Sequence, residues 1–378
     1  MTTDTALFAA AKPGFTTISP DRDTVLSFDR EGRLFSYFKG GVTYRRALDS
    51  TVEVRWQEGH RQRRRLNPAE AARLFAEAYA VAANCLPYAD AAVEERLRLE
   101  ILPWTPERLL AERERFNRVY RPIAILPPDQ YLSIVLQATE GCTWNRCTFC
   151  TFYQDRPFRA KNEEEFAQHA RAVRDFLGRG VLMRKGIFLA DGNALALSQN
   201  RLEPLFETVR EVFPGREIFS FVDLYTGDRR PLEQWRRLAG LGLKRVYIGM
   251  ETGLDELLHF LNKPGSCEEL LRFVADLKQA GVAVGLIAMV GVGGKEYAAK
   301  HAEATLGALA RMPLNPGDLI YLSPFIEQPG SVYAQRRAQE GLTPLSDSEI
   351  AAELARWARE IRRWGFRAAR YDIREFLY

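Results

Sequence analysis

Three cysteines stand close together near the middle of the chain, where Cys142, Cys147 and Cys150 form the spacing C-x4-C-x2-C in the run GCTWNRCTFC. Thiolates bind soft metal ions and iron-sulfur clusters. Three thiolates on one tight loop can each bind one iron of a cubane. No fourth cysteine lies nearby in the sequence, which leaves the fourth iron open to an exogenous ligand. The spacing therefore predicts a [4Fe-4S] cluster with a reactive iron.

Three other interpretations fit the same cysteines. A plant-type [2Fe-2S] site needs a fourth cysteine downstream, for which Cys267 is the candidate. A zinc site of the Cys3His kind needs a histidine, and the nearest downstream one, His169, does not have zinc-knuckle spacing. The third interpretation is that the thiols are buried as small hydrophobic groups. The position of the cysteines relative to the predicted strands favours the cluster.

From residue 131 onward, short apolar runs alternate with amphipathic helical segments, a pattern typical of parallel strands joined by helical crossovers. The runs are apolar on both faces, as strands buried in a parallel sheet are. We expect strands at residues 131–138, 185–190, 216–222, 244–250, 282–290 and 318–325. The six units predict an α/β fold, a partial (β/α)6 TIM-like barrel.

Polar residues and glycines follow these strands at their C-terminal ends, where barrel folds place their binding sites. The cysteine run comes directly after the first strand. The later strand ends supply Asp191, Gly192 and Asn193 after the second strand, Glu251 after the fourth, and Tyr321 and Ser323 at the sixth. An Asx turn also explains Asp191, and a simple salt bridge also explains Glu251. We expect these side chains to lie with the cysteines at the C-terminal end of the predicted barrel.

The cysteine loop, with Phe149 just before the third cysteine and a strand in front of it, resembles the radical SAM superfamily over about residues 131–325. Most members have the spacing C-x3-C-x2-C, so this chain carries one extra residue. The resemblance implies a [4Fe-4S] cluster held by the three cysteines and a bound S-adenosylmethionine. It also implies reductive cleavage of that cofactor to methionine and a 5'-deoxyadenosyl radical, which abstracts hydrogen from a substrate.

The resemblance also implies roles for the other strand-end residues. Asp191, with Gly192 and Asn193, stands where members place an acceptor for the ammonium group of S-adenosylmethionine. Glu251 lies in the run GMETG, similar to a motif that contacts ribose hydroxyls or the ammonium group, and Tyr321 and Ser323 stand beside the adenine in relatives. Arg156 and Arg159, just beyond the cysteines, are candidates for binding the cofactor carboxylate. A buried ion pair of either arginine with Asp155 or Glu163 is an equally good interpretation.

The chain divides into three predicted parts. Residues 1–125 contain a hairpin-like segment and a long helical stretch from Pro68, and predict an α+β cap of unknown role. The proline-bearing segment 121–130 is the best boundary before the core, residues 126–328. Residues 329–378 predict a helical extension.

The composition points to no special partner, because the net charge is only +4 over 378 residues. Neither a signal peptide nor an apolar stretch of about 18 residues is present, so we expect a cytoplasmic protein without a membrane span. A low-potential donor such as ferredoxin or flavodoxin is implied. The substrate is unidentified, and a small molecule is favoured over RNA because the basic run 60–65 reads as an exposed turn. The alternatives are a tRNA-modifying enzyme, or a non-enzymatic zinc or iron-sulfur binding protein.

Overall fold

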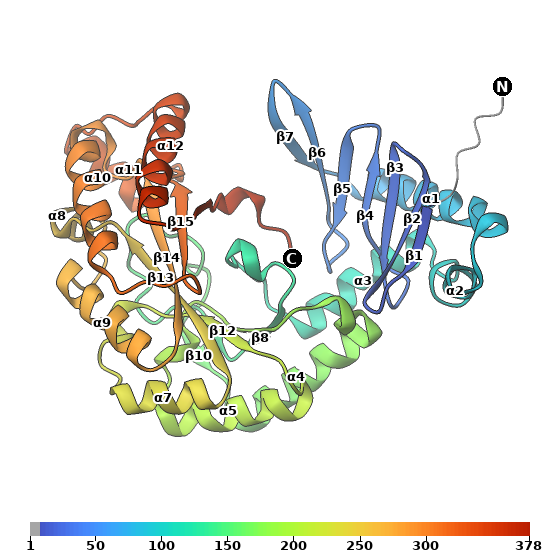
Figure 1. The fold of residues 1–378 in the computed structure, drawn as a ribbon, viewed down its shortest axis with the longest axis horizontal. Coiled ribbons are helices and arrows are strands. Elements are labelled where there is room, and N and C mark those ends of the chain that lie inside the picture. The colour runs from blue at the N-terminus through green and yellow to red at the C-terminus, as the bar shows by residue number, and fades with distance from the viewer. Residues whose placement is uncertain (1–7) are drawn as a thin grey trace.

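Two seven-stranded sheets, formed by different parts of the chain, dominate the fold (Figure 1). The computed structural model describes residues 8–378. The first sheet is antiparallel with the order β1-β2-β3-β4-β5-β6-β7, and the second is parallel with the order β16-β15-β14-β13-β12-β11-β8. Two short strands, β9 (Thr139–Glu140) and β10 (Arg159–Ala160), pair with each other beside the parallel sheet.

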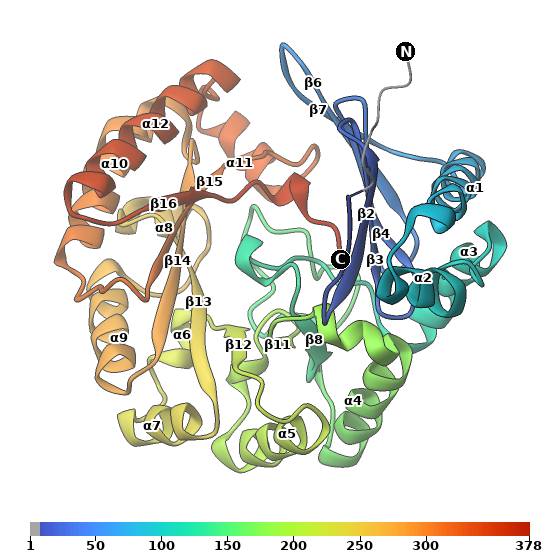
Figure 2. The same cartoon turned by 45° about the vertical axis from the view of Figure 1, so that its right-hand side comes forward.

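The antiparallel sheet is a meander in which each strand pairs with the next along the chain. Its strands are β1 (Phe8–Ala11), β2 (Phe15–Asp21), β3 (Thr24–Asp29), β4 (Leu34–Lys39), β5 (Val42–Arg46), β6 (Val52–Glu58) and β7 (His60–Arg65). Three helices cover the face that is turned away from the parallel sheet (Figure 2): α1 (Pro68–Asn84), α2 (Ala91–Arg96) and α3 (Pro106–Val119). Phe28, Tyr37 and Phe75 are fully buried between the strands and the helices and anchor a core separate from that of the parallel sheet.

The parallel sheet contains all six strands that the sequence predicts. They are β8 (Ile134–Gln137), β11 (Ile187–Ala190), β12 (Ile218–Phe221), β13 (Leu243–Glu251), β14 (Ala283–Val290) and β15 (Leu319–Pro324). The long connecting helices are α4 (Glu163–Leu177), α5 (Gln199–Val212), α7 (Leu232–Gly240), α9 (Cys267–Gln279) and α10 (Gly294–Arg311), with the short α6 (Leu224–Gly227) and α8 (Asp255–Phe260) after two of the strands. Asn162 and Glu165 form the predicted capping box of α4.

The C-terminal part corrects one expectation. Residues 329–378 are helical in α11 (Val332–Gln339) and α12 (Asp347–Arg363), but residues Ala368–Arg370 form β16, a seventh parallel strand beside β15. Trp357 and Ile361 of α12 are buried against the sheet, so this helix acts as a further crossover that returns the chain parallel to β15. The strand was missed because it is three residues long and lies at the sheet edge, where burial imposes little apolar pattern.

A second expectation, an exposed turn at the basic run 60–65, is right about exposure, since Arg61, Gln62, Arg64 and Arg65 are exposed, but wrong about the turn. These residues form β7, which pairs with β6 over its whole length. The hairpin touches the end of the chain, because the Arg55 guanidinium donates to the Glu375 carbonyl oxygen at 3.1 Å and Arg61 forms an ion pair with the Glu375 carboxylate at 3.5 Å. Pairing with β6 satisfies the backbone of a segment whose side chains are too polar for a core.

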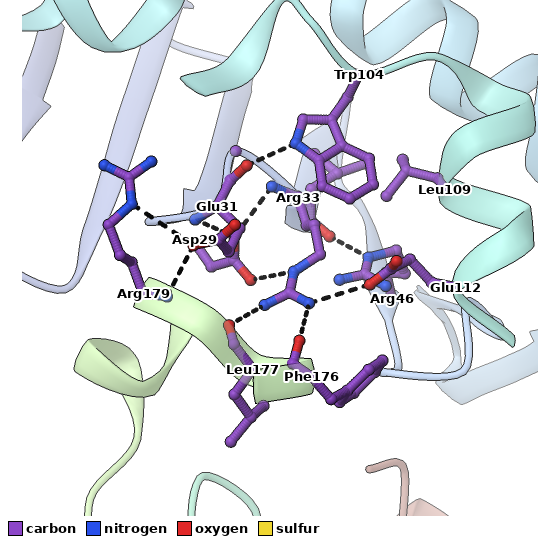
Figure 3. A network of polar contacts seen from close by, with 12 residues as sticks. Asp29, Glu31, Arg33, Arg46, Trp104, Leu109, Glu112, Phe176, Leu177 and Arg179 are labelled. Atoms are coloured by element: carbon purple, nitrogen blue, oxygen red, sulfur yellow. Dashed lines mark hydrogen bonds and ion pairs between the residues drawn. The ribbon is translucent and has the colours of Figure 1, made fainter. Parts of the chain in front are cut away.

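Arg33 joins the antiparallel sheet to the layer of helices around the parallel one (Figure 3). Its guanidinium forms ion pairs with Asp29 at 2.8 Å and Glu112 at 3.0 Å, and donates to the carbonyl oxygens of Phe176 and Leu177 at the C-terminal end of α4. A cation at this position satisfies carbonyls that lack helical partners and complements the helix dipole. The two parts of the chain are therefore joined by a buried polar contact.

Among residues 8–378, no helix is both long and apolar enough to cross a lipid bilayer.

Candidate active site

A cavity of about 230 Å³ opens at the C-terminal ends of the parallel strands and brings the cysteine loop together with later strand ends. Its wall is mostly apolar, including Phe149, Phe221 and Ile287. Its charged lining residues are Asp223, Glu251 and Lys263. An apolar pocket with a few convergent polar groups has the usual character of a cofactor or substrate site.

The three cysteines line this cavity from the loop after β9 and are partly buried and free of disulfides. Burial raises the pKa of the Cys147 thiol to about 12 and that of Cys150 to about 11. The loop by itself therefore holds neutral thiols, and a bound metal has to supply the positive charge that stabilises thiolates. Assembly of a cluster on this loop releases protons.

The donor set fits a cubane better than a single ion. Among the residues that the structure describes, no three His, Cys, Asp or Glu side chains converge closely enough to hold one metal ion. A cubane binds each thiolate through a different iron, so its three cysteines do not have to converge on one point. His169 is buried on α4, where its Nε2 accepts the Gln137 backbone amide at 2.9 Å. Cys267 begins α9 and does not line the cavity. These positions disfavour the zinc and ferredoxin interpretations.

Gly192 explains how the end of β11 fits against the cysteine loop. A Cβ atom at this position would lie 2.9 Å from the Gly141 carbonyl oxygen and 3.1 Å from the Cβ of Cys142. Only glycine permits that approach, because real Cβ atoms do not come so close to backbone atoms. Gly192 lines the cavity and sets the distance between the second strand and Cys142.

Asp191 and Asn193, on either side of Gly192, are buried and do not line the cavity. The Asp191 carboxylate lies 3.7 Å from the Arg156 guanidinium, and burial raises its pKa to about 6, although Arg156 opposes the shift. The Asn193 amide donates to the hydroxyls of Thr143 and Thr226. One side-chain oxygen of Asp191 and one of Asn193 have no hydrogen-bond partner. The proposed contact of Asp191 with an ammonium group stays a prediction.

Arg156 also pairs with Asp155 at 3.0 Å, but the Asp155 side chain is 63% exposed, so this is not the buried pair of the alternative interpretation. Arg159 pairs with Glu140 and Glu165 at the edge of the loop, and not with Glu163.

Glu251, at the end of β13, lines the cavity and forms a close ion pair with Lys263, whose Nζ lies 2.7 Å from Oε1 of the carboxylate. Burial lowers the pKa of Lys263, but the Glu251 carboxylate more than offsets this, so the ammonium is held charged. Gly249 makes room for the pair, since a Cβ there would lie 2.2 Å from Oε1 of Glu251. The salt-bridge interpretation of Glu251 is thus correct in geometry, and the pair faces the same space as the cysteines.

The sixth strand places its two predicted residues differently. Ser323 lines the cavity, whereas Tyr321 does not. The Tyr321 hydroxyl donates to Asp129 at 2.6 Å, in a buried polar group that also includes Tyr247. The two residues have the same parity and share one face of β15, but Ser323 lies nearer the C-terminal end of the strand, where the cavity opens. The expected contact of Tyr321 with adenine stays a prediction without support from its position.

Sequence reasoning missed several cavity residues. Lys263 lies in a turn of the run NKPG, where a lysine is normally an exposed charge. Tyr371 and Ile373, from the segment after β16, also line the cavity and could not be found without the seventh strand. The lining residues all lie at or beyond Ile125, so the N-terminal sheet supplies none of them. The expected cap stands beside the parallel sheet (Figure 2), and of its residues only the last, Ile125, is among those that line the cavity.

Comparison with known proteins agrees with the resemblance predicted from the cysteine loop. A family model described as the radical SAM superfamily matches residues 136–305. No curated protein sequence matches the chain. Similar solved structures include the Escherichia coli coproporphyrinogen III oxidase HemN, described as a radical SAM enzyme, at 15% identity and a TM-score of 0.46, with 68% of this chain and 56% of HemN covered.

Two further structures are similar over part of the chain. The radical S-adenosylmethionine methyltransferase TsrM from Kitasatospora setae is 15% identical with a TM-score of 0.41, covering 54% of this chain and 40% of TsrM. Methylornithine synthase PylB is 16% identical with a TM-score of 0.42, covering 75% of this chain and 73% of PylB. The chain thus spans about two fifths of TsrM and just over half of HemN. Residues 136–305 are therefore similar to the radical SAM superfamily, and the cysteine loop lies inside the matched region.

Proposed function

We propose that this enzyme holds a [4Fe-4S] cluster on Cys142, Cys147 and Cys150 and cleaves S-adenosylmethionine reductively. The observation that supports this most directly is that the three thiols share one cavity with Gly192, Glu251 and Lys263. When bound, the reduced cluster would supply one electron to S-adenosylmethionine, giving methionine and a 5'-deoxyadenosyl radical that abstracts a substrate hydrogen. The curved parallel sheet with helices on its outer side fits a partial (β/α)6 barrel, which belongs to the same proposal.

The chain's own residues prepare this chemistry in three ways. Cys142, Cys147 and Cys150 would each hold one iron of the cluster, and the fourth iron would be open to S-adenosylmethionine. Glu251 presents a carboxylate oxygen for hydroxyl or ammonium donors, and Lys263 presents a cation to the carboxylate of a methionine moiety. The apolar wall excludes water, which protects a radical from side reactions.

The substrate proposed is a small molecule, because the cavity is lined mostly by apolar side chains and the basic strand β7 does not line it. A ferredoxin or flavodoxin donor and a cytoplasmic location are part of the same proposal.

Anaerobic reconstitution tests the function. We expect about four irons per chain and, on reduction with S-adenosylmethionine, 5'-deoxyadenosine measured by mass spectrometry. The Cys147→Ala variant should lose both, whereas Cys85→Ala, which changes a buried cysteine of the other core, should keep both. Stoichiometric zinc without any nucleoside product would contradict the proposal. A 3-amino-3-carboxypropyl product would agree with the proposed cofactors but show that a different carbon-sulfur bond of S-adenosylmethionine is cleaved. Modification of bulk tRNA would contradict the proposal of a small-molecule substrate.

A further inference from the structure

A row of aromatic and cationic side chains leads from the cysteine loop to the protein surface. Trp144, between the first two cysteines, packs on Tyr225 with ring centroids 5.8 Å apart. The Arg146 guanidinium lies 5.7 Å from the centroid of the Trp144 ring, and the Arg229 guanidinium lies 4.1 Å from that of the Tyr225 ring. We call these four residues the Trp144–Tyr225 face.

The face is anchored firmly to the cavity. The Trp144 indole N–H donates to the Asn262 carbonyl oxygen at 2.8 Å, and the Asn262 side-chain amide donates to the Arg146 carbonyl oxygen at 2.8 Å. Asn262 is followed directly by Lys263, which pairs with Glu251 inside the cavity. Trp144 itself lines the cavity together with Cys142 and Cys147. Trp144 therefore borders the cavity that the cysteines line, and Tyr225, which packs on it, reaches the surface.

The charge on the face is not neutralised. Arg146 and Arg229 are exposed, and no carboxylate among the described residues lies within 4.0 Å of either guanidinium. Tyr225 is 39% exposed, so part of its ring is open to a partner. Tryptophan, tyrosine and arginine are the residues enriched in protein interfaces and their energetic centres. A small surface suffices, because complexes that transfer electrons are among the smallest and weakest protein contacts.

We propose that the Trp144–Tyr225 face is the docking site of a small acidic redox protein that reduces the cluster. The inference rests on the proposed function, because it needs a cluster on the neighbouring cysteines. In the step, one electron leaves the reduced centre of the donor, which is oxidised, and enters the cluster, which is reduced. No bond forms or breaks, and no proton moves. Electron transfer slows steeply with distance, so the surface directly outside the cysteine loop is where a donor gains most by binding.

Single-stranded RNA is the other partner that aromatic and arginine side chains can bind, since bases stack on exposed rings. Here part of each ring surface is already covered, which leaves less of it for a base to stack on. Trp144 and Tyr225 pack on each other at an interplanar angle of 51°, and each ring also carries an arginine. The observations therefore favour a partner that is recognised by its negative charge.

The test uses the full chain and a purified acidic flavodoxin as the probe. Reduction of the reconstituted cluster is followed by its visible absorbance, once with reduced flavodoxin and once with dithionite. We expect Arg229→Glu to slow reduction by flavodoxin at least about 10-fold at low salt, and rising salt to slow the wild-type reaction, because steering by exposed charge is screened. Dithionite should reduce both proteins equally. Arg171→Glu, which reverses an exposed charge on α4, is the matched control.

Binding of flavodoxin is also measured on protein without a cluster, so the docking site is tested even where the proposed function fails. Weaker binding of Arg229→Glu and Tyr225→Ala in this assay supports the inference. Equal rates and equal binding for wild type and Arg229→Glu would overturn it, as would an equal loss in Arg171→Glu. Tight binding of tRNA that depends on Arg229 and displaces flavodoxin would assign the face to RNA instead. A cluster that dithionite cannot reduce contradicts the proposed function, and leaves the binding result to decide the docking site.

Discussion

Two buried cations, one in each part of the molecule, show how the same kind of group serves different ends. Arg33 is 1% exposed, and its guanidinium contacts two carboxylates and two carbonyl oxygens (Figure 3). Lys263 is 16% exposed, and its ammonium contacts the single carboxylate of Glu251 at the wall of the cavity. Arg33 is therefore satisfied by the protein alone, whereas Lys263 keeps donors available for a ligand.

This difference between Arg33 and Lys263 distinguishes charged residues that stabilise the fold from charged residues that are available to bind a ligand. A buried ion pair becomes costly when one partner is removed, because the other is left uncompensated in a medium of low polarity. Where the pair faces a cavity, water can enter and reduce that cost. We expect changes around Arg33 to affect stability and changes around the cavity to affect cofactor binding. Four predictions test this separation.

The largest effect is expected from a pair of glycine variants. Gly192→Ala would place a methyl group 2.9 Å from the Gly141 carbonyl oxygen and so displace the cysteine loop, and we expect it to lose most of the iron bound on reconstitution. Gly180→Ala is the matched variant, because its methyl group would lie 2.5 Å from the Arg33 guanidinium. It should lower stability by about 1–3 kcal/mol and keep the iron. Iron analysis and urea unfolding measure the two effects. Equal loss of iron in both variants would contradict the distinction between residues that affect stability and residues that affect cofactor binding.

Next in size is the removal of the Arg33 charge. Arg33→Met leaves Asp29 and Glu112 without their buried cation, and we expect a loss of about 3–5 kcal/mol in the free energy of unfolding. The surface pair of Arg98 with Glu94 provides the control, since Arg98→Met should cost less than about 1 kcal/mol. Urea denaturation measures both. Similar losses in the two variants would show that the Arg33 network does not hold the two parts together.

A third prediction concerns acid. His301 is buried against Thr252 and the Met289 carbonyl oxygen, and burial lowers its pKa to about 4. Between pH 6.5 and 4, the unfolded chain binds a proton that the folded chain does not, so stability falls as the pH falls, by up to about 3 kcal/mol. Hydrogen exchange over this range should show the loss in the parallel-sheet part. In His301→Gln the decline should be shallower, and an unchanged slope would contradict the assignment.

The smallest effect on stability is expected at the cavity. Lys263→Met leaves Glu251 with access to water, so we expect a loss of about 1–3 kcal/mol, less than for Arg33→Met. The double variant with Glu251→Gln should recover much of it, as a double-mutant cycle on unfolding would show. S-adenosylmethionine binding, measured by calorimetry, should be weakened in both variants. A loss as large as that of Arg33→Met would mean that Lys263 is a structural charge like Arg33.

Much of this arrangement could be predicted from the sequence because it depends on short-range pattern. The six strands of the parallel sheet are apolar runs between amphipathic helices, and the three cysteines follow the first of them directly. Gly192, Glu251 and Ser323 could be placed beside the cysteines because parallel strands bring their C-terminal ends to one edge of the sheet. Spacing along the chain was sufficient for these residues.

Only the tertiary structure decided the rest. Lys263 lies in an ordinary turn, and its importance comes from the fold of β13, which brings Glu251 within 2.7 Å. Asp191 and Tyr321 are as suggestive in sequence as Glu251, yet both are directed into buried polar contacts, because which side of a strand end faces the cavity depends on packing. β16 and the place of the N-terminal sheet were likewise set by contacts between residues far apart in the chain. The sequence by itself determined the cysteine loop and the succession of strands along the chain, since both are local patterns. The lining of the cavity depends on packing between residues far apart in the chain, which no local pattern predicts.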